Sequence, residues 1–159
     1  MGRVLSHDEL LQRVSELRRR GSRISFANGH FDLLHVGHLR YLRGARAVAD
    51  VLVVGINDDP SVTRLKGAGR PLMPAVERAE LLAALEPVDI VVVFDGDSPA
   101  ELLKELRPDV HCKGTDYGSP DAVPEFEVVR RYGGTTVLVG DPKDHSSTDL
   151  IARIKRLPD

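Results

Sequence analysis

The sequence predicts an α/β protein: a doubly wound, five-stranded parallel sheet within a single domain. Short apolar runs rich in β-branched residues alternate with segments of helical spacing, which is the pattern of parallel strands joined by crossover helices. Most of these runs lack strict apolar–polar alternation, as expected for strands that are covered on both faces. The expected strands are 23–28, 51–56, 90–94, 109–113 and 135–139.

The segments between these runs carry the start and stop signals of helices. Ser6 and Glu9 form a capping box ahead of a helical pattern of apolar residues. Pro74 and Pro99 are expected at the openings of two further helices, with Pro99 at the first helical position. Another helix is expected to end at Gly133, because glycine is favoured just past a helix C-terminus.

Length and composition limit the class of protein. The 159 residues fit one domain, with an N-terminal helix in 1–22 and the core in 23–157. A net charge of −2 argues against non-specific binding of nucleic acid. No run resembles the apolar part of a signal peptide or is long enough to span a bilayer, so we expect no membrane partner and a cytoplasmic location. Cys112 is the only cysteine, which excludes an internal disulfide and a CxxC zinc site.

Four polar, glycine-bearing segments each follow an expected strand. They are NGHFDLLHVGH (28–38), NDDPSVTRLKGAGRP (57–71), KGTDYGSP (113–120) and GDPKDHSST (140–148). In open α/β sheets, ligands bind in the crevice outside the carboxyl ends of the strands. The four segments are therefore expected to converge on one binding site.

The first of these segments holds three histidines within nine positions. A helix is expected to begin near residues 37–38, so His35 and His38 face the same side of its first turn. The N–H groups at a helix N-terminus attract anions, and Gly37 allows the backbone to approach a ligand closely. This pattern favours a phosphate cradle. Two alternatives stay open: a zinc site that includes His30, although its spacing matches no familiar pattern, and loop histidines without a ligand. A dinucleotide loop is excluded, because G-x-G-x-x-G is absent.

NGHFDLLHVGH resembles the N-G-x-F-D-x-L-H-x-G-H signature of the nucleotidyltransferase superfamily that carries the H-x-G-H motif. TRLKGAGRPLMP, ERAELLAALEPVD, PDVHCKGTDY and RRYGG resemble, in the same order, blocks of the heptose 1-phosphate adenylyltransferases. The similarity covers nearly the whole chain. It implies one Rossmann-like nucleotidyltransferase domain that transfers AMP from ATP to a heptose 1-phosphate, releasing pyrophosphate and forming ADP-heptose.

The resemblance also implies roles for single residues. The catalytic residues would be His35, His38 and Lys66, with the two histidines holding the α- and β-phosphates. The nucleotide-binding residues would be Asn28, Gly29, Phe31, His35, Gly37, His38, Ser146, Ser147 and Thr148. The substrate-binding residues would be Arg70, Arg78, Lys113 and Asp116. Structural roles stay open for some of them: Arg78 as a partner of Glu77 or Glu80, and Ser146 or Ser147 as an N-cap. Asp32 is expected to fix its loop.

The resemblance further implies a Mg²⁺ ion that bridges the triphosphate without a dedicated protein cage, so no metal ligands are assigned. It implies a homodimer and a separate sugar kinase in the same pathway. Asp144 stands where related sequences often have glycine, and a carboxylate there leaves the choice between ATP and CTP open. His30 and His145 receive no role. The alternatives are a cytidylyltransferase acting on a polyol phosphate or another small phosphate, and a non-catalytic nucleotide-binding domain.

Overall fold

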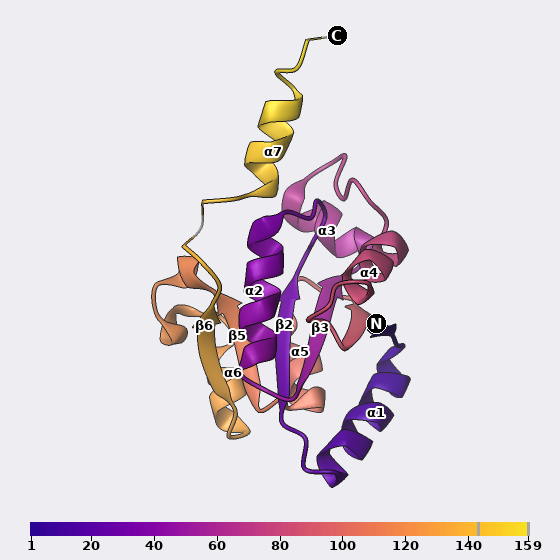
Figure 1. Ribbon diagram of the computed structural model, residues 1–159, viewed down its shortest axis with the longest axis vertical. Coiled ribbons are helices and arrows are strands. Elements are labelled where there is room, and N and C mark those ends of the chain that lie inside the picture. Colours follow the sequence, from indigo (N-terminus) through magenta and orange to yellow (C-terminus); the bar gives the residue numbers. More distant parts are fainter. Residues whose placement is uncertain (143, 159) are drawn as a thin grey trace.

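The computed structural model describes residues 1–142 and 144–158 (Figure 1). The strands are β1 (Arg3–Val4), β2 (Ile24–Gly29), β3 (Val51–Asn57), β4 (Ile90–Phe94), β5 (Val110–Gly114) and β6 (Thr135–Val139). The helices are α1 (His7–Arg19), α2 (Val36–Ala47), α3 (Asp59–Lys66), α4 (Ala75–Ala83), α5 (Ala100–Leu106), α6 (Phe126–Arg131) and α7 (Ser147–Ile154). Two 3₁₀ turns, Thr115–Tyr117 and Pro120–Ala122, lie between β5 and α6.

The strands pair in parallel in one sheet of six, in the order β1-β4-β3-β2-β5-β6. The predicted α/β fold is confirmed, but the expected number of five strands is wrong by one. The additional strand, β1, pairs Arg3 with Ile90 and Val4 with Val91. A strand of two residues is too short to show a periodic pattern in the sequence, which is why it was missed.

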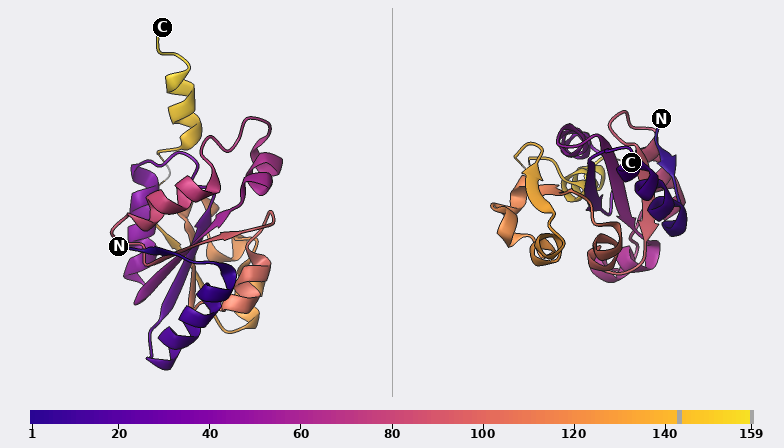
Figure 2. Two further views of the ribbon diagram at one scale, coloured as in Figure 1. Left: turned by 90° about the vertical axis from the view of Figure 1, so that its right-hand side faces the viewer. Right: turned by 90° about the horizontal axis from the view of Figure 1, so that it is seen from below.

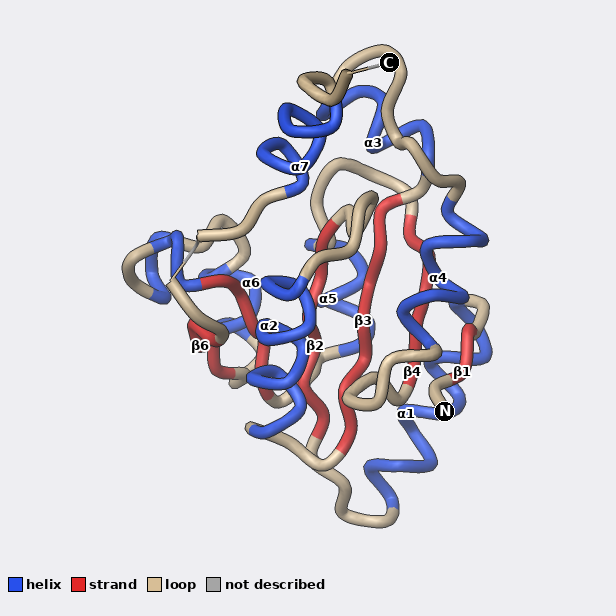
Figure 3. Tube along the Cα trace, turned by 45° about the horizontal axis from the view of Figure 1, so that its top comes forward, coloured by secondary structure: helices blue, strands red, loops and turns tan. Residues whose placement is uncertain are grey.

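Helices cover both faces of the sheet. Successive side chains of each strand point to opposite faces, so both faces carry apolar side chains that the helices bury. Phe26 and Val53 face the layer of α1, α5 and α6. Ala27 and Val54 face the layer of α2 and α4. Figure 3 shows the strands in the middle of the molecule with helices around them. The double layer explains why the strand sequences are apolar throughout.

Most helix ends follow the local signals. The capping box is present at the start of α1, and Gly133, with φ 87°, directly follows the C-cap of α6. Helix α5 begins at Ala100, so Pro99 is its N-cap residue rather than its first helical residue. Helix α3 lies in the polar segment 57–71, for which the sequence predicted no helix. It begins where the Asp58 side chain accepts a hydrogen bond from the Ser61 N–H.

The strand order places a topological switch point beside β2. The chain passes from β2 to β3 and β4 on one side and then places β5 on the other side of β2. Loops that leave the carboxyl ends of β2 and β5 therefore diverge and open a crevice between them.

Helix α7 extends beyond the rest of the chain and has no buried residue (Figures 1 and 2). Among the described residues, no helix has the length and apolar character needed to cross a membrane.

Candidate active site

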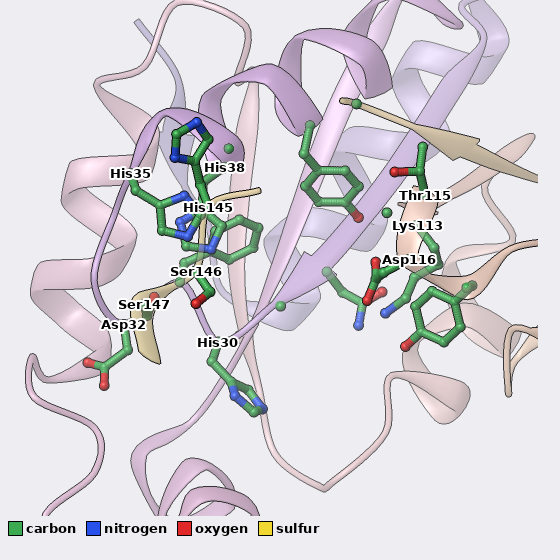
Figure 4. A pocket seen from close by; sticks show the side chains of 18 of the residues that line it. His30, Asp32, His35, His38, Lys113, Thr115, Asp116, His145, Ser146 and Ser147 are labelled. Carbon is green, nitrogen blue, oxygen red and sulfur yellow. The ribbon is translucent and has the colours of Figure 1, made fainter. Parts of the chain in front are cut away.

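A cavity of about 570 Å³ lies at this switch point. Its wall includes residues from all four polar segments, among them Gly29, Lys66, Thr115 and Ser146. The predicted convergence of these segments on one site is confirmed. Figure 4 shows His35, His38 and His145 gathered on one side of the cavity, with Lys113, Thr115 and Asp116 across from them.

The paired histidines of the H-x-G-H stretch stack on one another. Their ring centroids are 3.8 Å apart with an interplanar angle of 23°. His35 is the N-cap residue of α2 and His38 lies in its first turn, so the helix start fixes both rings on one side. The ring of Phe31 packs against His38 with a centroid distance of 5.1 Å. The expectation that both imidazoles face the same side is confirmed.

Gly37 keeps the space beside these rings open. A Cβ atom at this position would lie 2.9 Å from Nδ1 of His35 and 3.3 Å from Cβ of His145. Contacts this short force neighbouring atoms to move. The glycine therefore lets two histidine-bearing segments lie close together with their present ring positions, in addition to any approach of a ligand.

The segment before α7 is attached to the histidine loop. Ser146 caps α7 by accepting a hydrogen bond from the Asp149 N–H at 3.0 Å, so its expected capping role is confirmed. Ser147 Oγ donates a hydrogen bond of 3.0 Å to the carbonyl oxygen of Leu33. These contacts bring Ser146, Ser147 and Thr148 to the cavity wall.

His145, on the same segment, lies beside the histidine pair. Its ring centroid is 6.4 Å from that of His35. Its Nε2 is 3.3 Å from a carboxylate oxygen of Asp144, and both residues line the cavity. The imidazole of His145 and the carboxylate of Asp144 therefore form one polar patch on this wall.

Asp32 fixes the loop that carries Arg70, as expected from the sequence. The carboxylate is buried and accepts hydrogen bonds from the N–H groups of Leu72 (2.7 Å) and Met73 (3.0 Å) and from Arg70 Nε (2.6 Å). Burial raises the pKa of Asp32, but the N–H donors and the guanidinium outweigh burial, and the net pKa lies below its ordinary value. The pair leaves Arg70 on the cavity wall.

Arg78 is not part of the cavity wall, and its predicted substrate-binding role is corrected. The residue has 0 % exposure. Its guanidinium donates to the carbonyl oxygens of Met73, His30 and Asn57 and to a carboxylate oxygen of Asp59 at 2.6 Å. The suggested pairing with Glu77 or Glu80 is also replaced by these contacts. Arg78 holds the loops after β2 and β3 together from behind the site.

His30 lies on the cavity wall below the histidine pair (Figure 4). Burial, with the nearby cations Lys66, Arg78 and Arg70, lowers its pKa to about 4. His30 is therefore neutral at physiological pH. A neutral imidazole among three cations adds hydrogen-bonding capacity to this wall without adding charge.

The opposite wall combines a lysine with aromatic and acidic side chains. Lys113 Nζ lies 5.3 Å from the centroid of the Tyr117 ring. Burial lowers the pKa of Lys113, and the nearby Glu125 and Asp116 offset part of this effect. Behind this wall, Nε2 of the buried His111 is 3.0 Å from Oδ1 of Asn28. This contact fixes the side chain of Asn28 at the end of β2.

Comparisons with known proteins agree with this geometry. The family model described as cytidylyltransferase-like matches residues 26–153. The chain belongs to the cytidylyltransferase-like family. The match includes the H-x-G-H stretch, the end of α3 with Lys66 and the start of α7, which all contribute to the cavity wall.

Curated relatives are similar over almost the whole of this chain. Proteins named Bifunctional protein HldE are 50% identical over 148 residues in Nitrobacter hamburgensis and 49% identical over 153 residues in Geotalea uraniireducens. These matches cover 93% and 96% of this chain but only 30% and 31% of the relatives. The chain thus spans about a third of the length of the relatives.

A solved structure shares the fold. The crystal structure of the lipopolysaccharide core biosynthesis protein from Thermoplasma volcanium GSS1 matches with a TM-score of 0.63 and 24% sequence identity. The match covers 76% of this chain and 100% of that chain. At this identity the comparison supports the architecture of this cytidylyltransferase-like chain and nothing finer.

Within this family site, the structure brings together every predicted residue except Arg78. It also adds wall residues for which the sequence predicted no role, among them Asn57, Tyr41, Asp97, Tyr117, Glu125 and His145. Tyr117 and His145 stand next to predicted positions, which was a usable signal. Glu125 lies beyond the polar segments and carried no such signal. Among the described residues, no group of three or more His, Cys, Asp or Glu side chains is arranged to hold a metal ion.

Proposed function

We propose that this chain transfers AMP from ATP to a heptose 1-phosphate, releasing pyrophosphate and forming ADP-heptose. The stacked imidazoles of His35 and His38, 3.8 Å apart at the start of α2 and on the wall of the cavity, carry this proposal. The curated relatives named Bifunctional protein HldE and the resemblance to heptose 1-phosphate adenylyltransferases support the choice of reaction.

The reaction needs positioning and stabilisation of charge rather than a strong base. An oxygen of the ionised sugar phosphate attacks the α-phosphorus of ATP, a new P–O bond forms, and the bond to the β-phosphate oxygen breaks with pyrophosphate as the leaving group. His35 and His38 hold the α- and β-phosphates as negative charge moves onto the leaving group. Lys66 and Arg70, which also line the cavity, add positive charge toward the phosphates.

The other predicted residues hold the substrates in place. Asn28, Gly29, Phe31 and Gly37 border the nucleotide on the side of β2 and α2, and residues 146–148 border it on the side of α7. Lys113 and Asp116 face them across the cavity and contact the acceptor.

Mg²⁺ would be held chiefly by the triphosphate. The described residues provide no cluster suited to a protein-bound metal ion, whereas Mg²⁺ at nucleotide sites keeps several waters and binds phosphate oxygens. The ion would neutralise part of the phosphate charge. No step of the proposed reaction depends on a protein ligand to this ion.

A pyrophosphate-release assay tests the reaction. ATP and CTP are each supplied with heptose 1-phosphate, glycerol 3-phosphate and other small phosphates. Turnover with ATP and heptose 1-phosphate is expected. Turnover only with CTP and a non-sugar acceptor would instead identify the alternative, a cytidylyltransferase.

The third hypothesis, a non-catalytic nucleotide-binding domain, is tested by His38→Ala. Loss of one preorganised donor is expected to lower kcat about 10²–10³-fold while ATP binding changes little. His7→Ala, on an exposed histidine of α1, is the matched control and should keep wild-type kcat. Absence of turnover in the wild type with every nucleotide and acceptor would favour the non-catalytic domain.

We also propose two partners. A homodimer is expected, and light scattering measures it directly. A sugar kinase in the same pathway would supply the sugar 1-phosphate, since phosphoryl transfer to the anomeric hydroxyl is the reaction that generates such a substrate. The word bifunctional in the name of the relatives is consistent with a second activity in the part of those proteins that this chain does not match.

A further inference from the structure

The cavity contains a buried carboxylate, that of Glu125, which has no role in the proposed reaction. Glu125 lies between the 3₁₀ turn Pro120–Ala122 and α6, and it lines the cavity with 7 % exposure. Its Oε1 accepts a hydrogen bond of 3.0 Å from Ser98 Oγ. Among the described residues, no hydrogen-bond donor reaches its other oxygen, Oε2, which is also buried.

A carboxylate in this position is incomplete without a ligand. An ionised carboxylate only accepts hydrogen bonds and has about four acceptor positions, of which Ser98 fills one. Burial of a carboxylate oxygen with no donor is unfavourable, so a donor that arrives with a substrate gains more here than at a solvated surface. The free oxygen thus favours ligand groups that donate hydrogen bonds.

The surroundings restrict which donors fit. Phosphate oxygens are excluded, because two anionic acceptors repel each other. A metal ion lacks further ligands, since no suitable cluster exists among the described residues. Tyr117, whose pKa is raised by burial and by the nearby Glu125, and Lys113 add an aromatic face and a compensating cation. Neutral donor groups beside an aromatic ring remain, and the hydroxyl groups of a sugar are donors of this kind.

We propose that Glu125 is the hydroxyl-recognition carboxylate of this site, accepting hydrogen bonds from a sugar ring of a substrate through Oε2 while Ser98 holds Oε1. This inference rests on the proposed function for one point: that function supplies the two candidate sugars, which are the ribose of the nucleotide and the sugar of the acceptor phosphate. The chemistry is the same for both. Glu125 acts on binding and specificity and does not touch the reacting phosphorus.

Isothermal titration calorimetry tests the proposal without requiring turnover. One arm compares ATP with 2′-deoxy-ATP and 3′-deoxy-ATP. The other compares heptose 1-phosphate with its 2-, 3- and 4-deoxy analogues. Each ligand is titrated into the wild type, Glu125→Ala and the closely isosteric Glu125→Gln, which preserves packing if the alanine variant does not fold.

In one arm, the wild type is expected to bind one deoxy analogue about 10–100-fold more weakly than the parent ligand, as for loss of a hydrogen bond to a charged group. Glu125→Ala should reduce this ratio to below about 3-fold, and Glu125→Gln should reduce it substantially. The arm that responds identifies the sugar. Glu127→Gln, two residues along on the exposed side of α6 and paired with Arg130, should keep the wild-type ratio.

Two results would overturn the proposal: no discrimination by the wild type in either arm, or the same ratio in the wild type and in both Glu125 variants. A structural role alone would weaken parent and analogue equally and leave the ratio unchanged. Because binding is measured, failure of the pyrophosphate assay would reject the proposed reaction separately, without deciding the role of Glu125.

Discussion

Replacing Gly37 by alanine adds a single Cβ atom, which is expected to affect the stability of the protein and its catalytic rate differently. The added Cβ would lie 2.9 Å from His35 Nδ1 and 3.0 Å from His35 Cε1. Favourable contacts between such atoms begin near 3.5 Å, so the His35 ring must move by roughly half an ångström or more. That movement changes the stack with His38, whose ring centroid is 3.8 Å away.

The expected effects on stability and activity have opposite signs. Gly37 lies in the first turn of α2 and its φ is not in the left-handed region, so alanine favours the helix there by about 0.5–1 kcal/mol at most. Displacement of a positioned catalytic group by about 1 Å costs on the order of 10²-fold in rate. This corresponds to about 2.7 kcal/mol of transition-state stabilisation. We therefore expect unchanged or slightly raised Tm with a kcat/KM lowered about 30–100-fold.

Thermal unfolding and the pyrophosphate assay measure the two quantities on the same preparation. Val36→Ala is the matched control, since Val36 is the preceding residue of the same helix turn, is exposed and does not line the cavity. It should keep wild-type kcat/KM. A Gly37→Ala variant that retains kcat/KM within about 3-fold of the wild type would show that the positions of the imidazoles do not limit the reaction. The geometric basis of the proposed function would then be wrong.

Three further variants test the framework around the site. Arg78→Met is expected to lower the free energy of unfolding in urea by about 3–5 kcal/mol, because it leaves Asp59 and three carbonyl oxygens without their buried donor; a loss below about 1 kcal/mol would contradict the structural role. Asp32→Asn is expected to cost ~2–3 kcal/mol by the same measurement and to release Arg70, since its charge-assisted hydrogen bonds are lost; wild-type stability would argue against it. Burial, with a smaller effect of the nearby Lys113, lowers the pKa of His111 to about 3, below its ordinary value of 6.5. The neutral His111 therefore contributes fully to stability above pH 6.5, and this contribution is lost as the pH falls toward 3. His111→Phe should therefore flatten the decrease in unfolding free energy between pH 7 and pH 5, and equal slopes would refute this assignment.

Most of the sheet was predictable because a strand that is buried on both faces has a continuously apolar sequence. The runs 51–56, 90–94 and 135–139 are continuously apolar or β-branched and appear as β3, β4 and β6. What escaped prediction was β1, whose two residues gain their conformation from pairing with β4. Helix α3 escaped because its sequence, DPSVTRLK, is polar on most sides and short. Tertiary context decides the structure of such segments.

The site divides in the same way between local and long-range information. The histidine stretch was recognisable because its residues are close in sequence and their spacing fixes their geometry. Glu125 was not, since it and Glu127 are both acidic residues at a helix start, and only the tertiary structure makes one buried and hydrogen-bonded to Ser98 and the other exposed. For Arg78 a signal did exist. It shares the face of α4 with Leu82, four residues on, and therefore faces the core.

The distribution of charge in the cavity connects the two proposals. Imidazoles and the cations Lys66 and Arg70 lie on the wall of β2, α2 and the segment that ends α3 and follows it. The unsatisfied acceptor of Glu125 lies toward α6, where Lys113 is the nearby cation. A substrate with an anionic phosphate chain at one end and hydroxyl groups at the other is complementary to this arrangement in only one direction. Reversal would place phosphate against Glu125, and the attraction between the phosphates and the cations Lys66 and Arg70 would be lost. The carboxylate thus selects orientation by repulsion as well as by hydrogen bonding, which gives a buried acidic residue a reason to be present in a site that binds polyanions.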